Sequence, residues 1–196
     1  MATISKRPNS ILWMTGLSGA GKTTISNAFA ESLKASGITC AVLDGDELRK
    51  GLNANLSFSP DDRKENVRRI AHVAKLLTAY VEVVIVAVIS PTRACRELAR
   101  GIIGEHFFEI FVDAPISICE SRDPKGLYKQ VRAGRIGNFT GLSDTYEPPS
   151  SPSLHLQTDR LSVDEEIRQL KELLYARTTI NAARQEQVDV HRLDIR

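Results

Sequence analysis

Residues 16–23 spell Gly-Leu-Ser-Gly-Ala-Gly-Lys-Thr, a complete G-x-x-x-x-G-K-T motif, and restrict the possible folds more than any other segment. The motif follows an apolar run at 11–15 and opens a helical pattern at 22–35, the context that a phosphate-binding loop needs. Its glycines let backbone N–H groups point at phosphate oxygens, and the helix N-terminus adds partial positive charge. We expect Lys22 to bridge the β and γ phosphates of a nucleotide and the Thr23 hydroxyl to hold Mg²⁺. The alternative is a glycine-rich strand-to-helix turn without a ligand.

Short apolar runs alternate with longer segments of helical periodicity along the chain. The first four runs are largely apolar, as expected of strands covered on both faces. Strands are predicted at 11–15, 39–43, 83–89, 107–112 and 154–156, and helices at 22–35, 60–80, 93–103 and 163–175. This order predicts an α/β fold in which helices cover both faces of a parallel sheet, connected by right-handed crossovers. With its phosphate loop, the chain is expected to have a P-loop NTPase fold of the nucleoside-monophosphate-kinase-like type.

Glycines and prolines interrupt the pattern between Arg122 and Pro152. We therefore predict a lid at about 122–150, inserted before the last strand of a single domain at 1–177, and leave the tail at 178–196 unassigned. Residues 122–135 carry five basic side chains and one acidic side chain. A basic lid would supply charge to a transferring phosphoryl group and exclude water, whereas the alternative is a solvated basic helix.

Composition limits the binding partners and the cellular compartment that can be expected for this chain. The 196 residues suit one domain, and the formal charge of +2 is far from that of a chain held on nucleic acid, so no nucleic-acid partner is expected. No apolar stretch approaches the roughly 20 residues of a membrane-spanning helix, so no membrane association is expected. The three cysteines include no C-x-x-C pair, which favours a reduced, cytoplasmic setting. The sequence has no N-K-x-D motif for guanine recognition, so a small kinase is favoured over a GTPase.

Two carboxylates follow the predicted strand at 39–43. Asp44 and Asp46 stand at the carboxyl end of that strand, where ligands bind in open α/β sheets. Asp46 is a candidate to orient an acceptor hydroxyl and take up its proton, or to hold Mg²⁺ through water. The alternative for both residues is structural, as a turn residue and a helix N-cap.

The helix predicted at 60–80 carries a second polar pair. Ser59, Pro60 and the acidic residues that follow mark its start. Arg63 and Asn66 lie three residues apart on its first turns and share a face, so they can reach one ligand together. Phe58 offers a flat surface to a base, or alternatively packs against the helix as a hydrophobic staple.

Eight segments occur in one order between Ile11 and Asp159. They read GLSGAGKTT, LDGDxxRxGL, FSxxDRxENxRR, ISPxR, FVDAP, CExRDPKGLY, FTG and YEPPxxPxLxLxTD. Together they resemble the adenylylsulfate kinase family, and DRxEN combined with RDPKGLY is specific to that family among small kinases. The resemblance implies that the γ-phosphate of ATP is transferred to the 3′-hydroxyl of adenosine 5′-phosphosulfate (APS), with Mg²⁺ as cofactor. It also implies a homodimer.

The resemblance implies a role for each matching residue. Lys22, Asp46 and Ser90 match catalytic positions; Ser90 matches a phosphoenzyme serine, although in-line transfer favours a polar contact to substrate instead. ATP binding is implied for Gly16, Leu17, Ser18, Gly19, Ala20, Gly21, Lys22, Thr23, Thr24 and Arg122. Substrate binding is implied for Asp46, Arg49, Phe58, Arg63, Asn66, Ile89, Ser90, Lys125, Gly126, Leu127, Arg132 and Phe139. Phe58 and Phe139 match two rings that sandwich the adenine of APS, and Thr23 and Asp46 match the metal side, Asp46 through water.

Two positions depart from the family pattern. Gly137 stands where a lysine is usual before FTG, and Thr92 replaces the aromatic ring usual in ISPxR. Both changes bear on the acceptor and leave the phosphate loop intact, so the alternative function is a kinase of the same fold with another small hydroxyl acceptor. A nucleotide-binding regulatory subunit without turnover is a third hypothesis, which the intact Lys22, Thr23 and Asp46 disfavour.

Overall fold

A five-stranded sheet in the order β2-β3-β1-β4-β5 forms the centre of the molecule. The computed structural model describes residues 9–176, so the tail at 178–196 lies outside the described residues. The strands are β1 (Ser10–Thr15), β2 (Cys40–Asp44), β3 (Val83–Ala87), β4 (Phe107–Asp113) and β5 (Leu154–Gln157). Each neighbouring pair in this sheet is parallel, which confirms the predicted sheet.

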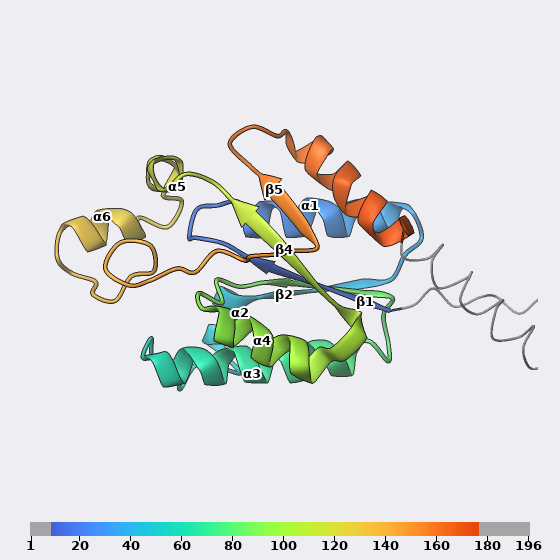
Figure 1. Cartoon of the computed structure of the whole chain (residues 1–196), viewed down its shortest axis with the longest axis horizontal. Helices are drawn as coiled ribbons and strands as arrows, with labels where there is room; N and C mark the ends of the chain where they lie inside the picture. Colours follow the sequence, from blue (N-terminus) through green and yellow to red (C-terminus); the bar gives the residue numbers. More distant parts are fainter. Residues whose placement is uncertain (1–8, 177–196) are drawn as a thin grey trace, which may run out of the picture.

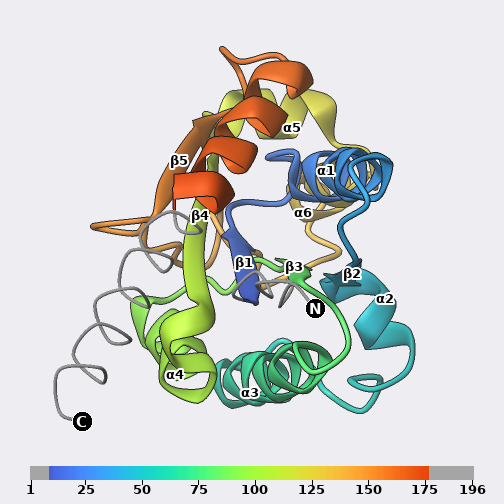
Figure 2. The same cartoon turned by 90° about the vertical axis from the view of Figure 1, so that its right-hand side faces the viewer.

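Helices cover both faces of the sheet, as predicted. They are α1 (Lys22–Ala35), α2 (Gly45–Lys50), α3 (Pro60–Leu77), α4 (Arg93–Ile103), α5 (Ile116–Arg122) and α6 (Leu127–Arg132), with a 3-10 turn at Gly104–His106 and a further helix at 163–176. Figures 1 and 2 show α1 and the helix at 163–176 on one face, α3 and α4 on the other, and α5 and α6 beyond one end of the sheet. No helix within residues 9–176 is both long and apolar enough to cross a bilayer.

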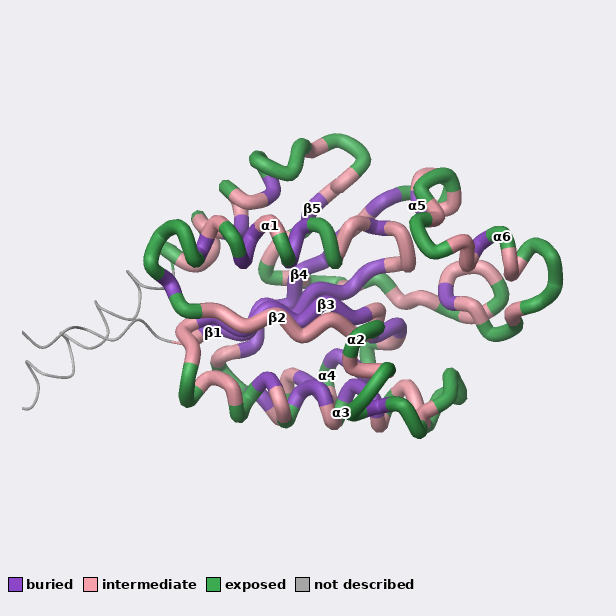
Figure 3. Tube along the Cα trace, turned by 180° about the vertical axis from the view of Figure 1, so that it is seen from behind, coloured by how far each residue is buried: buried purple, intermediate pink, exposed green. Residues whose placement is uncertain are grey.

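The alternation of side chains along the central strand explains the two layers. All six residues of β1 are buried. Leu12 and Met14 face the cluster that contains the apolar side of α1, whereas Ile11 and Trp13 face the cluster built from α3 and α4. In Figure 3 the buried backbone accordingly concentrates in the strands between the helical layers. Burial on both faces fixes the position of β1 and therefore of the loop that follows it.

Two predicted elements are shorter in the structure. β3 ends at Ala87 instead of Ile89, and Ser90, just beyond it, has a left-handed backbone (φ 40°) that no regular strand contains. α3 ends at Leu77, and residues 78–80 continue as hydrogen-bonded turns. The short helix α5 was not predicted, and α2 and α6 were considered only as alternatives, as a helix capped near Asp46 and a basic helix in the lid, because six or seven residues give too little periodicity to identify a helix.

Candidate active site

The phosphate loop connects β1 to α1 and packs tightly against neighbouring backbone. Gly16, Gly19 and Gly21 all have positive φ (152°, 78° and 104°), which favours glycine at each position. A Cβ atom at Gly16 would lie 2.1 Å from the Val112 carbonyl oxygen, and one at Gly19 would lie 2.7 Å from the Cys119 carbonyl oxygen. The glycines are therefore required both by the turn and by its close approach to β4 and α5.

Lys22 lies inside this loop. Its Nζ donates hydrogen bonds to the carbonyl oxygens of Gly16 (2.8 Å) and Leu17 (2.7 Å). Burial lowers the pKa of Lys22 to about 8, and the positive charge of Lys125 on the lid contributes in the same direction. The site thus concentrates positive charge in a desolvated place, an arrangement that favours a polyanionic ligand.

A lid residue that the sequence did not single out supports the loop from the other side. Tyr128 is 1% exposed, and its hydroxyl donates to the Ser18 carbonyl oxygen at 3.0 Å. Asp123 holds the start of α6 by accepting hydrogen bonds from the backbone N–H groups of Tyr128 and Lys129. The RDPKGLY segment contains both residues, so the motif was visible, but nothing local showed that its tyrosine reaches the phosphate loop.

Arg122 lies beside the phosphate loop, as its predicted ATP-binding role requires. Its guanidinium donates to the Thr158 hydroxyl (2.9 Å) and carbonyl (2.8 Å) oxygens and approaches the Gly19 carbonyl oxygen at 3.4 Å. The Thr158 hydroxyl in turn donates to the Ala20 carbonyl oxygen at 2.9 Å. Thr24, the other residue of the ATP group outside the motif, lies exposed on the first turn of α1.

Oxygen ligands gather where α1 begins. The Thr23 hydroxyl donates to Asp44 Oδ2 at 2.8 Å, while Asp44 Oδ1 accepts the backbone N–H of Asp46 and so caps α2. Asp44 therefore fills the N-cap role left open by the sequence and also lies beside Thr23. Asp46 forms an ion pair with Lys125 of the lid. This contact brings the predicted catalytic carboxylate and the predicted substrate-binding lysine together.

Arg63 connects the two segments that carry the predicted adenine-binding rings. Its Nε donates to the Phe58 carbonyl oxygen at 2.9 Å, and its Nη atoms donate to the Asn138 carbonyl oxygen (2.7 Å) and the Thr140 hydroxyl (2.8 Å). The Arg63 side chain is only 11% exposed and also pairs with Asp144 at 3.2 Å. The backbone beside Phe58 and the backbone beside Phe139 are thus held by one guanidinium.

The other predicted acceptor residues of this region lie close by. Phe58 is 59% exposed, and the Arg49 guanidinium lies 4.3 Å from its ring centroid. Arg49 also donates to the carbonyl oxygens of residues 56 and 57, and its pKa is lowered, chiefly by burial and then by the charge of Arg63. Asn66 is buried, and its Oδ1 accepts a hydrogen bond from Asn53 Nδ2 at 3.0 Å. Neither Arg63 nor Asn66 points into bulk solvent.

The other predicted site residues also contact neighbouring groups of the protein. Ser90 is 3% exposed, and its hydroxyl oxygen accepts a hydrogen bond from Trp13 Nε1 at 3.1 Å. Arg132 of α6 pairs with Glu120 of α5 at 2.9 Å. The Ile89 carbonyl oxygen accepts from the Thr15 hydroxyl at 2.6 Å. Gly126 caps α6 with positive φ (64°) and Leu127 begins it; Phe139 packs edge-on against Tyr128 with ring centroids 5.0 Å apart.

A phosphate loop at the end of a parallel strand, a basic lid beside it and a second cluster of polar contacts around Arg63 define a P-loop kinase. A family model of adenylylsulphate kinases matches residues 8–157. The adenylyl-sulfate kinase of Paraburkholderia xenovorans is 52% identical over 167 residues, which cover 85% of this chain and 93% of that protein. The chain belongs to the adenylylsulfate kinase family.

Solved structures agree with this assignment. The Mycobacterium tuberculosis APS kinase in complex with AMPPNP and APS is 47% identical with a TM-score of 0.82, covering 86% of this chain and 98% of that one. The hexameric APS kinase of Thiobacillus denitrificans is 32% identical with a TM-score of 0.67, covering 88% of this chain and 30% of that one. The predicted P-loop kinase fold is confirmed.

Proposed function

We propose that this chain transfers the γ-phosphoryl group of ATP to the 3′-hydroxyl of APS, giving 3′-phosphoadenosine 5′-phosphosulfate. Family membership and the solved complex of a relative with AMPPNP and APS support this reaction. The observation in this chain that carries it is the position of Arg63, which joins the Phe58 segment to the lid segment at 138–140. An aromatic ring beside two arginines, Arg49 and Arg63, suits a planar base that carries an anionic group.

Separate groups of residues bind the donor, bind the acceptor and assist the transfer. The backbone amides of 16–21 and Lys22 hold the donor phosphates, and Arg122 binds ATP at the edge of the same loop. Phe58, Phe139, Arg49, Arg63 and Asn66 hold the acceptor. Asp46 orients the acceptor hydroxyl and takes up its proton, after the incoming ligands have separated it from Lys125. Lys125, on the lid, lies close enough to influence Lys22 electrostatically and supplies charge near the transferring group.

The donor set fits the Mg²⁺ that this chemistry requires. Mg²⁺ prefers oxygen ligands and is held in phosphotransfer sites by one or two protein groups together with water and substrate phosphates. The Thr23 hydroxyl and the Asp44 carboxylate lie 2.8 Å apart at the start of α1, and Asp46 follows on α2. Thr23 would hold the ion with its hydroxyl, and Asp44 and Asp46 would hold it through water. Such an ion would neutralise charge on the donor phosphates.

The proposal extends to the domain organisation, the oligomeric state and the cellular compartment of the protein. We propose that residues 1–177 form one catalytic domain with its lid at 122–150, that the protein acts as a homodimer, and that it works in the cytoplasm. The three cysteines of the sequence are free thiols, in keeping with a reducing setting. Analytical ultracentrifugation of the full chain tests the dimer, with a single monomeric species as the opposing result.

Turnover with a panel of acceptors tests the proposed reaction. The full chain is incubated with ATP, Mg²⁺ and either APS, adenosine 5′-monophosphate or a sugar acid, and ADP release is followed together with identification of the phosphorylated product. We expect ADP release to depend on APS and the product to carry phosphate on the 3′-hydroxyl. Faster turnover with another acceptor would favour the alternative kinase, and tight ATP binding with no transfer to any acceptor would favour a regulatory subunit.

A matched pair of aromatic substitutions tests the acceptor pocket. Phe58 and Tyr80 are both exposed aromatic side chains, at 59% and 82%. F58A is expected to raise the KM for APS by about tenfold, because stacking on a base contributes roughly 1–3 kcal/mol. Y80A, in the turn that follows α3, is expected to leave both KM values unchanged. Equal KM values for APS in the two variants would place the acceptor elsewhere.

A further inference from the structure

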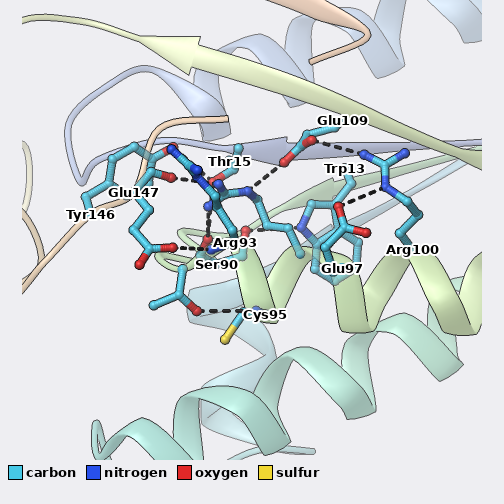
Figure 4. A network of polar contacts seen from close by, with 12 residues as sticks. Trp13, Thr15, Ser90, Arg93, Cys95, Glu97, Arg100, Glu109, Tyr146 and Glu147 are labelled. Carbon is cyan, nitrogen blue, oxygen red and sulfur yellow. Dashed lines mark hydrogen bonds and ion pairs between the residues drawn. The ribbon is translucent and has the colours of Figure 1, made fainter. Parts of the chain in front are cut away.

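A buried arginine outside the predicted site connects the turn that follows β3 to the segment that leaves the lid. Arg96 lies on the first turns of α4 and is 1% exposed. Its hydrogen bonds place it between the turn that follows β3, which contains Ser90, and the segment that leaves the lid, which contains Tyr146 and Glu147. Figure 4 shows these two segments side by side. We call residues 138–147 the return limb of the lid. Sequence reasoning assigned Arg96 no role.

The guanidinium of Arg96 contacts three different elements at once. Its Nε donates to Glu109 Oε1 on β4 at 2.6 Å. One Nη donates to the Ser90 carbonyl oxygen at 2.9 Å, and the other donates to the Glu147 carbonyl oxygen at 2.6 Å. A planar fork of donors can satisfy these diverging acceptors, whereas the single ammonium of a lysine cannot reproduce the geometry.

Direct contacts between the turn and the return limb surround this fork. The Glu147 N–H donates to the Pro91 carbonyl oxygen at 2.8 Å, and Glu147 Oε2 accepts the backbone N–H of Arg93 at 2.7 Å. The Tyr146 hydroxyl lies 3.1 Å from the Thr15 hydroxyl at the end of β1. The return limb is thereby attached to α4, to the turn and to the central strand.

The conformation of Ser90 makes this attachment necessary. Ser90 has φ 40°, a conformation that costs energy for a residue with a side chain and persists only where the surroundings impose it. Trp13 holds its hydroxyl and Arg96 holds its carbonyl oxygen. Because Ile89 and Ser90 are the predicted acceptor contacts, the position of this turn sets one side of the acceptor pocket.

The opposite end of the return limb is held by the acceptor-side arginine. Arg63 donates to Asn138 and Thr140 and pairs with Asp144. The phosphate loop is also held by contacts outside the return limb, those of Tyr128, Arg122 and Thr158. The return limb meets the loop at its start, where Gly141 lies against the Leu17 side chain and Tyr146 lies beside Thr15. Loosening the attachment at Arg96 should therefore disturb the acceptor side more than the nucleotide loop.

We propose that Arg96 is a positioning residue for the acceptor, which fixes the return limb of the lid against the Ile89–Pro91 turn without touching substrate. This inference rests on the proposed function, because it assigns the pocket between these segments to APS. Glu109 contributes to this role, since it neutralises the buried guanidinium. The proposal predicts that replacing Arg96 raises the KM for APS and leaves the KM for ATP nearly unchanged.

Three variants of the full chain test this role. R96K keeps the charge beside Glu109 but loses the fork. E147A removes only the side-chain contact to the Arg93 N–H and leaves the buried ion pair intact, so it remains informative if R96K does not fold. R100Q is the matched control, because Arg100 also pairs with Glu109 (3.1 Å) and has no contact to Ser90 or Glu147 among its hydrogen bonds and ion pairs.

Steady-state kinetics and amide hydrogen exchange provide the readouts. We expect R96K to raise the KM for APS at least tenfold and E147A to raise it about threefold, both with the KM for ATP within twofold, while R100Q changes neither. Exchange at the amides of Arg93 and Glu147 should accelerate in R96K and not in R100Q. Equal changes in both KM values, or an unchanged KM for APS, would overturn the inference. If the unmodified chain fails to phosphorylate APS, the proposed function falls, and unchanged exchange in R96K would independently overturn the attachment.

Discussion

Proton uptake on ATP binding is a direct consequence of the environment of Lys22. In the free protein its pKa is lowered to about 8 from the ordinary 10.5, by burial first and by Lys125 second. Phosphate oxygens beside Nζ stabilise the charged form and move the pKa back toward its ordinary value. At pH 8 the free lysine is about half protonated and the bound lysine almost fully, so binding should take up about 0.5 proton. At pH 9 the uptake should approach about 0.9 proton.

The lowered pKa of Lys22 also determines how the affinity for ATP changes with pH. A base that is protonated only in the complex weakens binding as pH rises through the pKa of the free form. Between pH 7 and pH 9 the affinity for ATP should therefore fall by roughly tenfold, or about 1.4 kcal/mol. Above pH 8 the γ-phosphate itself is fully ionised, so the uptake observed there belongs to the protein.

Isothermal titration calorimetry in buffers of different ionisation enthalpy measures this uptake. K22R should abolish it near pH 8, because arginine does not titrate in this range. K125Q should reduce it, because removing the lid charge raises the pKa of Lys22 in the free protein. K129Q makes the same charge change at an exposed position of α6 and should leave the uptake unchanged. An absence of uptake at pH 8, or uptake that persists in K22R, would refute the reasoning.

Three further predictions concern stability. Burial raises the pKa of Glu166 to about 7, so the free energy of unfolding falls as pH rises from about 4.5 through 7. In urea titrations, E166Q should therefore raise the free energy of unfolding by about 1–2 kcal/mol at pH 8 and leave it unchanged at pH 4. G16A should lower the free energy of unfolding by about 2–5 kcal/mol, because its Cβ would meet the Val112 carbonyl oxygen and its φ is positive. G37A also has positive φ but has open space around it, so it should lower the same free energy by only about 1–2 kcal/mol in the same urea titrations. Y128F should cost about 1–3 kcal/mol in thermal unfolding and raise the KM for ATP, since it leaves a phosphate-loop carbonyl without its donor.

The parts of the molecule that the sequence predicted well are those determined by neighbouring residues. The phosphate loop needs its glycines within a few residues of one another, and the start of α3 needs only Ser59, whose hydroxyl accepts the Asp62 N–H at 3.2 Å, followed by Pro60. The apolar runs predicted the parallel sheet because both of its faces are covered. These features depend on local sequence and are therefore readable from one chain.

The acceptor side is assembled from segments far apart in the chain. Arg63 meets Asn138 across 75 positions, Tyr128 meets Ser18 across 110, and Trp13 meets Ser90 across 77. No periodicity or spacing encodes such contacts, so the resemblance to a family could propose the residues but not show how they are held. The ion pair of Arg132 with Glu120 illustrates the same limit, because the resemblance assigned this arginine to substrate binding without revealing its partner.

The two departures from the family pattern differ in what they mean physically. Thr92 caps α4, with its hydroxyl accepting the Cys95 N–H at 3.3 Å, so this position has a structural role that an aromatic ring does not supply. Gly137 has no positive φ, and a Cβ atom added there would meet no heavy atom within 4 Å, so no steric requirement keeps glycine at this position. The contacts that hold the proposed acceptor segments come from the side chains of Arg63 and Arg96 and do not involve the side chains of residues 92 and 137. A lysine at position 137 would add charge beside Asn138, whose carbonyl oxygen Arg63 already holds.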